Sequence, residues 1–97
     1  MLAVIFTAKV NELDDEYAET AVRMRDLALE KYGCTEFIAS TEGDMEIAIS
    51  YWENEDQIKA WKQNAEHLAA QAKGKSKWYQ SYSVKVVEVI REYGTEK

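Results

Sequence analysis

The sequence predicts an α+β fold in which one four-stranded antiparallel sheet carries two helices on a single face. Stretches of apolar alternation, typical of strands, occur near both ends of the chain and in its middle. Two segments with helical spacing of apolar residues separate these stretches. The resulting order is β-α-β-β-α-β, the order of a ferredoxin-like sandwich. The length of 97 residues predicts one domain, spanning 1–97.

The first strand and the first helix are predicted between the N-terminus and Gly33. In residues 2–10, LAVIFTAKV, the side chains alternate between two faces as in a strand. A helix follows from about Asp14 to Tyr32, with three acidic residues in its first turn, where the helix dipole favours negative charge. Gly33 is expected to end this helix in the left-handed conformation.

A β-hairpin is predicted next, from CTEFIAST at 34–41 and MEIAISYWE at 45–53, joined by the turn EGD. Asn54 is expected to cap the second helix, with Gln57 as its capping-box partner. That helical region is predicted to run to about Tyr79 and to break near Asn64. The last strand is YSVKVVEVIREY, residues 82–93.

The predicted strands carry apolar side chains on both of their faces. Val4 and Phe6, for example, alternate with Ala3 and Ile5. Two helices cover one face of a sheet, and soluble monomers avoid a large exposed apolar patch on the other. We therefore expect a homodimer with two-fold symmetry through the open sheet face. The alternative is a monomer whose open face is only mildly apolar.

The charge and the cysteine content restrict the partners and the compartment. The formal net charge is −6, which disfavours nucleic acid and anionic membrane surfaces as partners. The nearest basic group, Lys73, Lys75 and Lys77, is expected to form the solvated face of a helix end. The apolar N-terminus is too short for a membrane span and lacks the basic start of a signal peptide. The single cysteine, Cys34, predicts a reducing, cytoplasmic location and a packing role.

One face of the second predicted helix is polar and aromatic at once. Its members recur at spacings of three and four. They are Asn64, His67, Gln71, Gly74 and Trp78, and Trp61 begins the neighbouring stripe. Such a mixture suits the wall of a pocket for an aromatic ligand. The alternative is a partly exposed structural histidine with tryptophans in the core. One histidine and no tight carboxylate cluster predict no metal site.

The stretch YWENEDQIKAWKQNAEHLAAQAKGKSKWYQSYSVKVVEV, residues 51–89, resembles the antibiotic biosynthesis monooxygenase family of dimeric α+β barrel proteins. The resemblance extends over nearly the whole chain and implies a homodimer that binds a small molecule. Members of this family oxidise polycyclic phenols with O₂ and no cofactor, degrade haem, or act on small signalling molecules. Kinship in fold alone therefore leaves the reaction open.

Cofactor-free oxidation is the function that we expect. It needs an apolar slot, a base of moderate pKa and hydrogen-bond donors for the developing oxyanion. His67 is the candidate base or orienting donor, since its ordinary pKa suits this role near neutral pH. Asn64 is the candidate oxyanion partner. Trp61 is the third candidate catalytic residue, as a wall of the slot and an indole donor. The expected substrate-binding residues are Trp78, Gln71, Tyr51 and Tyr82.

Haem binding or degradation is the alternative that the resemblance also allows. The haem-degrading members carry an asparagine on the first strand, a tryptophan at the start of the second helix, and an iron-ligating histidine ten residues later. Trp61 matches the tryptophan, but Gln71 stands at the histidine position, and Phe6 and Thr7 at the asparagine position. The sequence therefore predicts no cofactor, with haem as the alternative. A third possibility is a small-molecule-binding dimer without catalysis.

Overall fold

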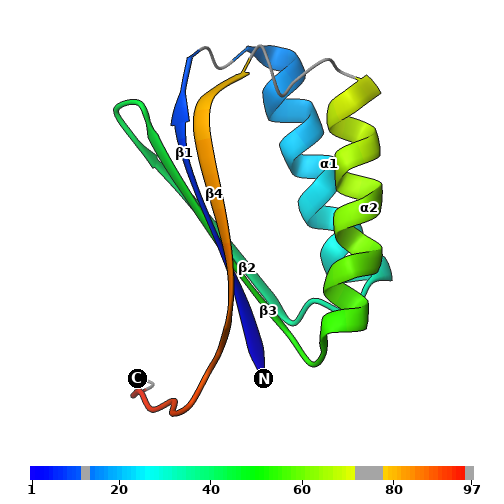
Figure 1. Cartoon of the computed structure of the whole chain (residues 1–97), viewed down its shortest axis with the longest axis vertical. Coiled ribbons are helices and arrows are strands. Elements are labelled where there is room, and N and C mark those ends of the chain that lie inside the picture. Colours follow the sequence, from blue (N-terminus) through cyan, green and yellow to red (C-terminus); the bar gives the residue numbers. More distant parts are fainter. Residues whose placement is uncertain (12–13, 72–77, 96–97) are drawn as a thin grey trace.

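The computed structural model describes residues 1–11, 14–71 and 78–95 and shows a sandwich of one sheet and two helices (Figure 1). The description of residues 68–71 covers the backbone alone. The elements follow the order β-α-β-β-α-β, so the predicted fold class is confirmed. Their bounds are β1 Leu2–Val10, α1 Asp15–Lys31, β2 Glu36–Glu42, β3 Met45–Trp52, α2 Glu55–Gln71 and β4 Tyr79–Glu88.

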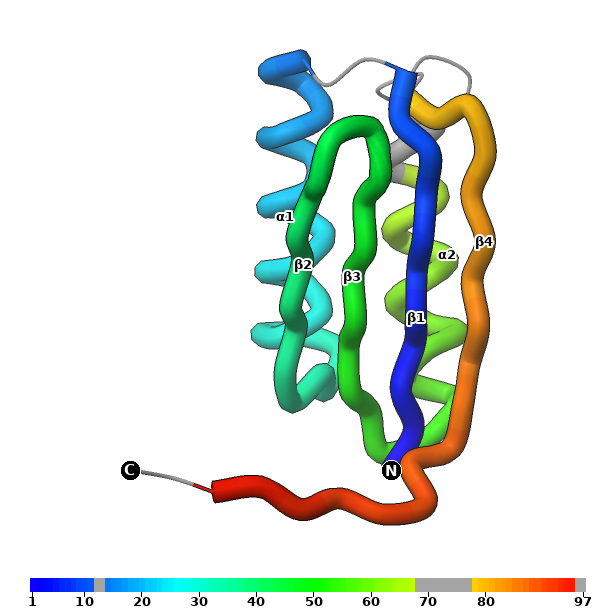
Figure 2. Tube along the Cα trace, turned by 90° about the vertical axis from the view of Figure 1, so that its left-hand side faces the viewer, coloured from blue at the N-terminus to red at the C-terminus, as the bar shows by residue number. Residues whose placement is uncertain are grey.

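The sheet is antiparallel throughout, with strand order β2-β3-β1-β4, so β1 lies between β3 and β4. Both helices lie on one face, as predicted, and the other face carries no helix (Figures 1 and 2). The predicted hairpin joins β2 and β3 around Gly43. The φ angle of Gly43 is 60°, a left-handed conformation that glycine adopts without strain.

Helix α1 has the ends that the sequence predicts. At its start, Asp14 Oδ1 accepts a hydrogen bond of 2.8 Å from the backbone N–H of Tyr17. This bond satisfies one of the free N–H groups of the first turn. At its end, Gly33 has a φ of 87°, and the N–H of Cys34 donates to the carbonyl of Ala28 at 3.0 Å. The left-handed glycine therefore closes the helix and returns the chain towards the sheet.

Helix α2 begins at the predicted cap. Asn54 Oδ1 accepts from the N–H of Gln57 at 3.0 Å, and Gln57 Oε1 accepts from the N–H of Glu53 at 3.1 Å. The two bonds form a capping box in which the N–H of Glu53, the residue before the cap, donates in place of the N–H of Asn54.

Three predicted boundaries are wrong. Helix α2 does not break near Asn64, because the Asn64 side chain donates to the Tyr32 hydroxyl at 2.9 Å and does not compete for the backbone of its own helix. Strand β4 begins at Tyr79 rather than at the predicted Tyr82, whereas the predicted helical end at about Tyr79 agrees with the helical backbone of Trp78. Strand β4 ends at Glu88 rather than residue 93, because its partner β1 begins at Leu2; one further backbone bond, from the N–H of Val89 to the carbonyl of Met1 at 3.0 Å, follows the ladder.

The core lies between the helices and the middle of the sheet. Trp52 is fully buried there, and its indole N–H donates to Ser50 Oγ at 2.8 Å, so its polar atom is satisfied. Cys34 is buried in the same cluster, as predicted, and burial raises the pKa of its thiol. The buried members of this cluster are Val4, Ala28, Cys34, Trp52 and Ile58.

The closing turn of α1 yields a stability prediction. Gly33→Ala should lower the free energy of unfolding by about 1–2 kcal/mol through its left-handed backbone alone. The added methyl would also meet the amide of Gln57, so we expect a further loss. Gly43→Ala is the matched control, because Gly43 is also left-handed but has open space around it. Urea unfolding measures both losses, and equal losses would contradict the proposed contact with Gln57.

Candidate functional site

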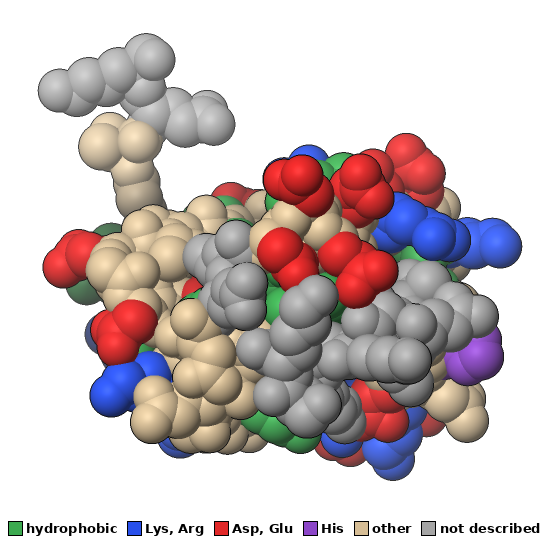
Figure 3. Space-filling model, turned by 90° about the horizontal axis from the view of Figure 1, so that it is seen from above, with side chains coloured by type: hydrophobic (Ala, Val, Ile, Leu, Met, Phe, Trp, Pro, Cys, Tyr) green, Lys and Arg blue, Asp and Glu red, His purple; other side chains and the backbone are tan. Residues whose placement is uncertain are grey.

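The predicted base, His67, stands exposed on α2. Together with Tyr32, Ala60, Gln63 and Asn64 it lines a shallow depression on the helical side of the molecule. The structure therefore brings His67 and Asn64 together, as the helical spacing predicts. In Figure 3 the single histidine of the chain appears at the surface.

The two tryptophans expected in one pocket lie apart. Trp61 donates its indole N–H to the carbonyl of Met24 at 2.8 Å, and its ring packs 5.5 Å from that of Trp52. Trp78 is buried at the start of α1, where its indole N–H lies 3.2 Å from Asp14 Oδ1. Both indole donors are thus engaged within the protein. The Gln71 side chain, Gly74 and the lysines at 73, 75 and 77 lie outside the described residues.

The two tyrosines expected to line one slot lie on opposite faces of the sheet. Paired residues in antiparallel strands share a face, and successive residues alternate. Tyr51 pairs with Ala3 on the open face, whereas Tyr82 pairs with Ala8 on the helix-facing side. Tyr51 and Tyr82 therefore cannot line one pocket within a single chain.

An aromatic cluster occupies the helix-facing side of the sheet near the start of β4. Phe6 lies 5.5 Å from Tyr79 and 6.0 Å from Tyr82, measured between ring centroids. Tyr17, from α1, lies 6.1 Å from Tyr79 and 5.1 Å from Trp78. We call these five residues the aromatic cluster. It includes Trp78 and Tyr82 of the predicted site residues and joins β1, α1 and β4.

A β-bulge creates this arrangement. Lys9 pairs with Ser81, but the next residue, Val10, pairs with Tyr79, so β4 contains one extra residue, Gln80. In a regular strand Tyr79 and Tyr82 would point to opposite faces, because three positions separate them. The bulge therefore places both phenol rings on the helix-facing side.

A buried carboxylate lies against the aromatic cluster. Glu46, on β3, is only 8% exposed, and the Tyr17 hydroxyl donates a hydrogen bond to its Oε2. Burial, with this hydrogen bond as a second cause, raises the pKa of Tyr17 far above its ordinary value. Burial also raises the pKa of Tyr79 to about 12. Both phenols consequently keep their protons near neutral pH, so they can donate hydrogen bonds or pass protons on.

The helix-facing side of β4 next to this cluster is open. Tyr82 is 50% exposed, and Val84 and Val86 are 45% and 46% exposed although they face the helical layer. An apolar, aromatic surface is thus accessible beside a buried acid. This combination suits the binding of a planar aromatic molecule that carries a hydroxyl group.

Sequence reasoning missed Tyr17, Glu46 and Tyr79 as members of the site. One signal was available for Glu46, because alternation along β3 places this acid on the same face as the core residue Trp52. No comparable signal existed for Tyr79, since the bulge that turns its ring is not visible in the residue pattern.

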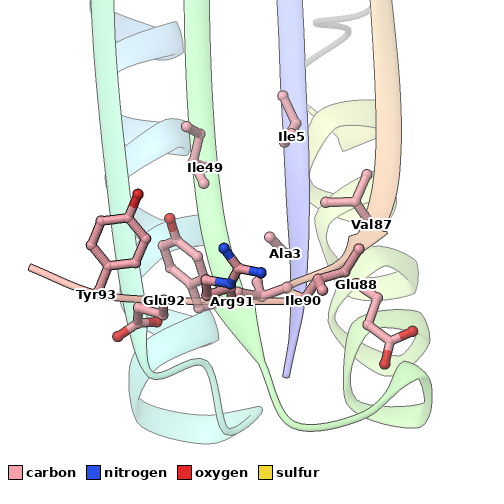
Figure 4. A pocket seen from close by; sticks show the side chains of 11 residues that line it. Ala3, Ile5, Ile49, Val87, Glu88, Ile90, Arg91, Glu92 and Tyr93 are labelled. Carbon is pink, nitrogen blue, oxygen red and sulfur yellow. The ribbon is translucent and has the colours of Figure 1, made fainter.

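The open face of the sheet holds a second, apolar hollow (Figure 4). Its floor includes Ala3, Ile5, Ile49 and Val87, and residues 88–93 form its rim. Further out on the same face, Ile38 and Ile47 are 49% and 45% exposed. The apolar open face expected from the sequence is therefore present.

The charged groups give no sign of a metal centre. Figure 3, seen from the end where α1 begins, shows carboxylates gathered there, and the first turn of α1 contributes Asp15 and Glu16. Within residues 1–11, 14–71 and 78–95, no three His, Cys, Asp or Glu side chains are placed to hold a metal ion. In the same ranges no helix is long and apolar enough to span a membrane. The cytoplasmic location stays a prediction.

Solved structures with the same architecture belong to small oxygenases and related proteins. A variant of SnoaB, a cofactor-independent oxygenase from Streptomyces nogalater, has a TM-score of 0.73 at 11% identity, covering 94% of each chain. A protein described as an antibiotic biosynthesis monooxygenase has a TM-score of 0.62 at 13% identity, covering 94% of this chain and 100% of its own. A variant of MhuD, with two manganese protoporphyrin IX molecules per active site, has a TM-score of 0.62 at 19% identity, covering 98% and 100%.

The fold is therefore that of the antibiotic biosynthesis monooxygenase proteins, which confirms at the level of the fold the resemblance seen in the sequence. No family model matches the chain. The uncharacterized protein YqjZ of Bacillus subtilis (strain 168) is 43% identical over 91 residues, covering 93% of this chain and 80% of YqjZ. The chain belongs to the same family as YqjZ.

The raised pKa of Tyr79 predicts the pH dependence of stability. A tyrosine in the unfolded chain titrates near pH 10, whereas Tyr79 in the folded protein titrates near 12. The stabilisation is complete below pH 10 and is lost as the pH rises through about 12, because only the unfolded chain releases the proton in between. Urea unfolding from pH 9 to 12 should show this loss.

Tyr79→Phe should reduce that loss by up to about 2 kcal/mol. Part of the fall in the free energy of unfolding with pH will remain in this variant, because the pKa of Tyr17 is also raised. Tyr93→Phe is the matched control, because the Tyr93 side chain is 85% exposed. An identical slope in Tyr79→Phe and the wild type would contradict the burial of the Tyr79 hydroxyl.

Proposed function

We propose that this protein is a small monooxygenase that oxidises an aromatic or phenolic small molecule with O₂ and without a cofactor, and that it works as a homodimer. The observation that carries the proposal is the aromatic cluster, whose rings border the buried Glu46 carboxylate beside an exposed part of β4. The likeness to SnoaB supports it, because SnoaB is described as a cofactor-independent oxygenase.

For the proposed reaction, the protein must bind the substrate, remove a proton from it and exclude water from the site. Removal of a proton from a phenol or an activated C–H group leaves an electron-rich anion, which transfers electrons to O₂. Rings at stacking distance provide the apolar surface for the substrate. Protonated phenols beside it can stabilise a developing oxyanion by hydrogen bonds.

The residues proposed from the sequence divide into two places. Trp78 and Tyr82 belong to the aromatic cluster and are proposed to line the substrate surface. His67 is the base proposed from the sequence, with Asn64 as oxyanion partner, and both lie at the exposed depression on α2. Trp61 and Gln71 stay proposed lining residues of that second place, whereas Tyr51 lies on the open face.

Oxygen uptake in the presence of reduced polycyclic phenols tests the proposed reaction. We expect O₂ consumption with formation of a quinone. If His67 is the base, His67→Ala should lower the rate near neutral pH by about 100-fold, the usual contribution of a general base. Lys59→Ala, an exposed change on the same helix, is the control and should leave the rate unchanged. Unchanged rates in His67→Ala would remove His67 from the mechanism.

Titration with haem distinguishes the two alternatives to the proposed reaction, which are haem binding and small-molecule binding without catalysis. MhuD, which shares the fold, binds manganese protoporphyrin IX, so a porphyrin site deserves a direct test. A saturable Soret band that weakens in His67→Ala would favour haem binding. The absence of both this band and O₂ uptake would favour a small-molecule-binding dimer without catalysis.

The proposed homodimer rests on the open face of the sheet. Residues 88–93 cross one end of this face (Figure 2), whereas Ile38 and Ile47 on the rest of it are about half exposed. The edges of this face carry opposite charges, with Glu36 on β2 and Lys85 on β4. A two-fold axis parallel to the strands would lay the β2 edge of one protomer over the β4 edge of its partner. A second copy of the chain therefore complements this face in both hydrophobicity and charge.

Ile47→Asp should dissociate the dimer, because it introduces a charge into the middle of the open face. Val22→Asp is the matched control, since Val22 lies on α1 and its exposed fraction of 46% matches the 45% of Ile47. Sedimentation velocity of both variants and the wild type measures the effect. A monomeric wild type, or a dimer that persists in Ile47→Asp, would overturn the proposed interface.

A further inference from the structure

A chain of three polar groups crosses the helix-facing layer from the inside outwards. Its inner end is the buried carboxylate of Glu46 on β3, which accepts a hydrogen bond from the Tyr17 hydroxyl. The next group outwards is Tyr79, whose ring lies 6.1 Å from that of Tyr17 and nearly perpendicular to it, and which contributes to the raised pKa of Tyr17. Its outer end, Tyr79, lies against Phe6 and Tyr82.

The carboxylate at the inner end has unusual surroundings. Burying a charge is costly unless a partner of opposite charge compensates it. In the part of the chain that the structure describes, no ion pair is recorded for Glu46. The nearby lysine on β1, Lys9, lies on the opposite face of the sheet and pairs with Asp44 at 3.9 Å.

Among the described residues, the polar groups recorded as interacting with Glu46 are the phenols of Tyr17 and Tyr79. Tyr17 reaches it from α1 and Tyr79 approaches from β4, and Asp14, which follows β1, is occupied by the Trp78 indole. An aliphatic side chain would fill the position of Glu46 on the face of Trp52 without the cost of desolvation. The acid is therefore better explained by a role in proton transfer than by packing.

The outer end of the chain of groups is where a ligand would arrive. Phe6 and Tyr82 are stacked, with an interplanar angle of 25°, and half of the Tyr82 side chain is exposed. A planar aromatic molecule stacked on this pair would place a substituent near the Tyr79 hydroxyl, because Tyr79 lies within 6.0 Å of both rings.

We propose that Tyr79, Tyr17 and Glu46 form a relay that removes the hydroxyl proton of a phenolic molecule stacked on Phe6 and Tyr82. The substrate proton passes to the Tyr79 oxygen, the Tyr79 proton to the Tyr17 oxygen, and the Tyr17 proton to the Glu46 carboxylate. The substrate becomes a phenolate and Glu46 becomes a neutral acid. Tyr79 is then the catalytic residue, while Tyr17 and Glu46 are positioning residues that act through it. This assignment rests on the proposed function for its substrate class, and it gives the removal of the phenol proton to Tyr79 in place of His67.

The state of the two tyrosines fits a relay. Burial holds the pKa of Tyr79 near 12 and that of Tyr17 higher still, so both hydroxyls stay protonated across the neutral range. A relay of this kind needs each phenol to hold one proton before the substrate arrives. It also needs an acceptor at its end, and the buried Glu46 carboxylate provides one.

A fluorescent phenol tests the relay without any turnover. The probe is 2-naphthol, whose excited state is a strong acid that emits differently as naphthol and as naphtholate. Bound to the wild-type protein, it should emit mainly as naphtholate, because the relay accepts its proton. Glu46→Gln keeps the size of the side chain but removes the acceptor, so the naphtholate fraction of the bound probe should fall severalfold. Glu19→Gln, an exposed change on α1, should match the wild type.

Two further variants keep the test decisive if Glu46→Gln fails to fold. Tyr79→Phe and Tyr17→Phe retain both rings but interrupt the relay, and each should reduce naphtholate emission in the same direction. Circular dichroism and thermal unfolding identify the folded variants. No binding of 2-naphthol to the wild type, or equal naphtholate fractions in the wild type and all folded variants, would overturn the relay.

Oxygen uptake separates failure of the relay from failure of the proposed function. If the relay variants lower naphtholate emission but the wild type consumes no O₂, the relay stands as part of a phenol-binding site and the monooxygenase proposal is wrong. If the wild type consumes O₂ but the relay variants emit as the wild type does, the monooxygenase proposal stands and the relay is wrong. If both hold, Glu46→Gln should lower the rate of O₂ uptake by about 100-fold.

Discussion

The alternation of side chains along the central strand β1 is the constraint on which the rest of the structure depends. One set of its residues, including Val4 and Ala8, faces the helices, and the other set, including Ala3 and Ile5, faces outwards. Because β1 pairs on both sides, its register decides which residues of β3 and β4 share each face. The core, the aromatic cluster and the open apolar face are all consequences of this one register.

The helices cover only part of one face of the sheet, so that face contains both a closed core and an accessible surface. Around Trp52 the helix-facing side is a closed core, whereas along Val84 and Val86 the same side stays accessible. Polar chemistry is concentrated between these regions, where Tyr17 reaches from α1 to Glu46. A buried acid at the boundary between core and accessible surface is shielded from water and still close to a ligand, which is the setting in which electrostatic effects are strongest.

Most of the fold could be predicted because its signals are local. The alternation in the strands, the caps at Asp14 and Asn54, and the left-handed Gly33 each act within a few residues, and the structure contains all of them. The break predicted near Asn64 failed because a contact distant in sequence, with the hydroxyl of Tyr32, satisfies that side chain. Local patterns do not contain information of this kind.

The candidate site was less predictable for the same reason. Helical spacing correctly placed Asn64 beside His67, but the pocket expected from it also included both Trp61 and Trp78, whose surroundings are set by α1 and the core. Glu46 could have been noticed as an acid on an apolar face, whereas the position of Tyr79 depends on an irregular pairing of β1 with β4. Sequence patterns specify which residues share an element, and tertiary pairing decides which elements share a site.

The extra residue in β4 has a consequence for the divergence of this family. Gln80 shifts the alternation of side chains between the two faces only for the part of β4 before it, which holds Tyr79. The pairing from Ser81 to Glu88 is regular. Loss of the Gln80 codon would remove the bulge and leave Tyr79 two positions before Tyr82, so a regular strand would still place both phenol rings on the helix-facing side. The number of residues between Trp78 and Tyr82 in any relative's gene therefore indicates whether that relative needs a bulge to keep this surface.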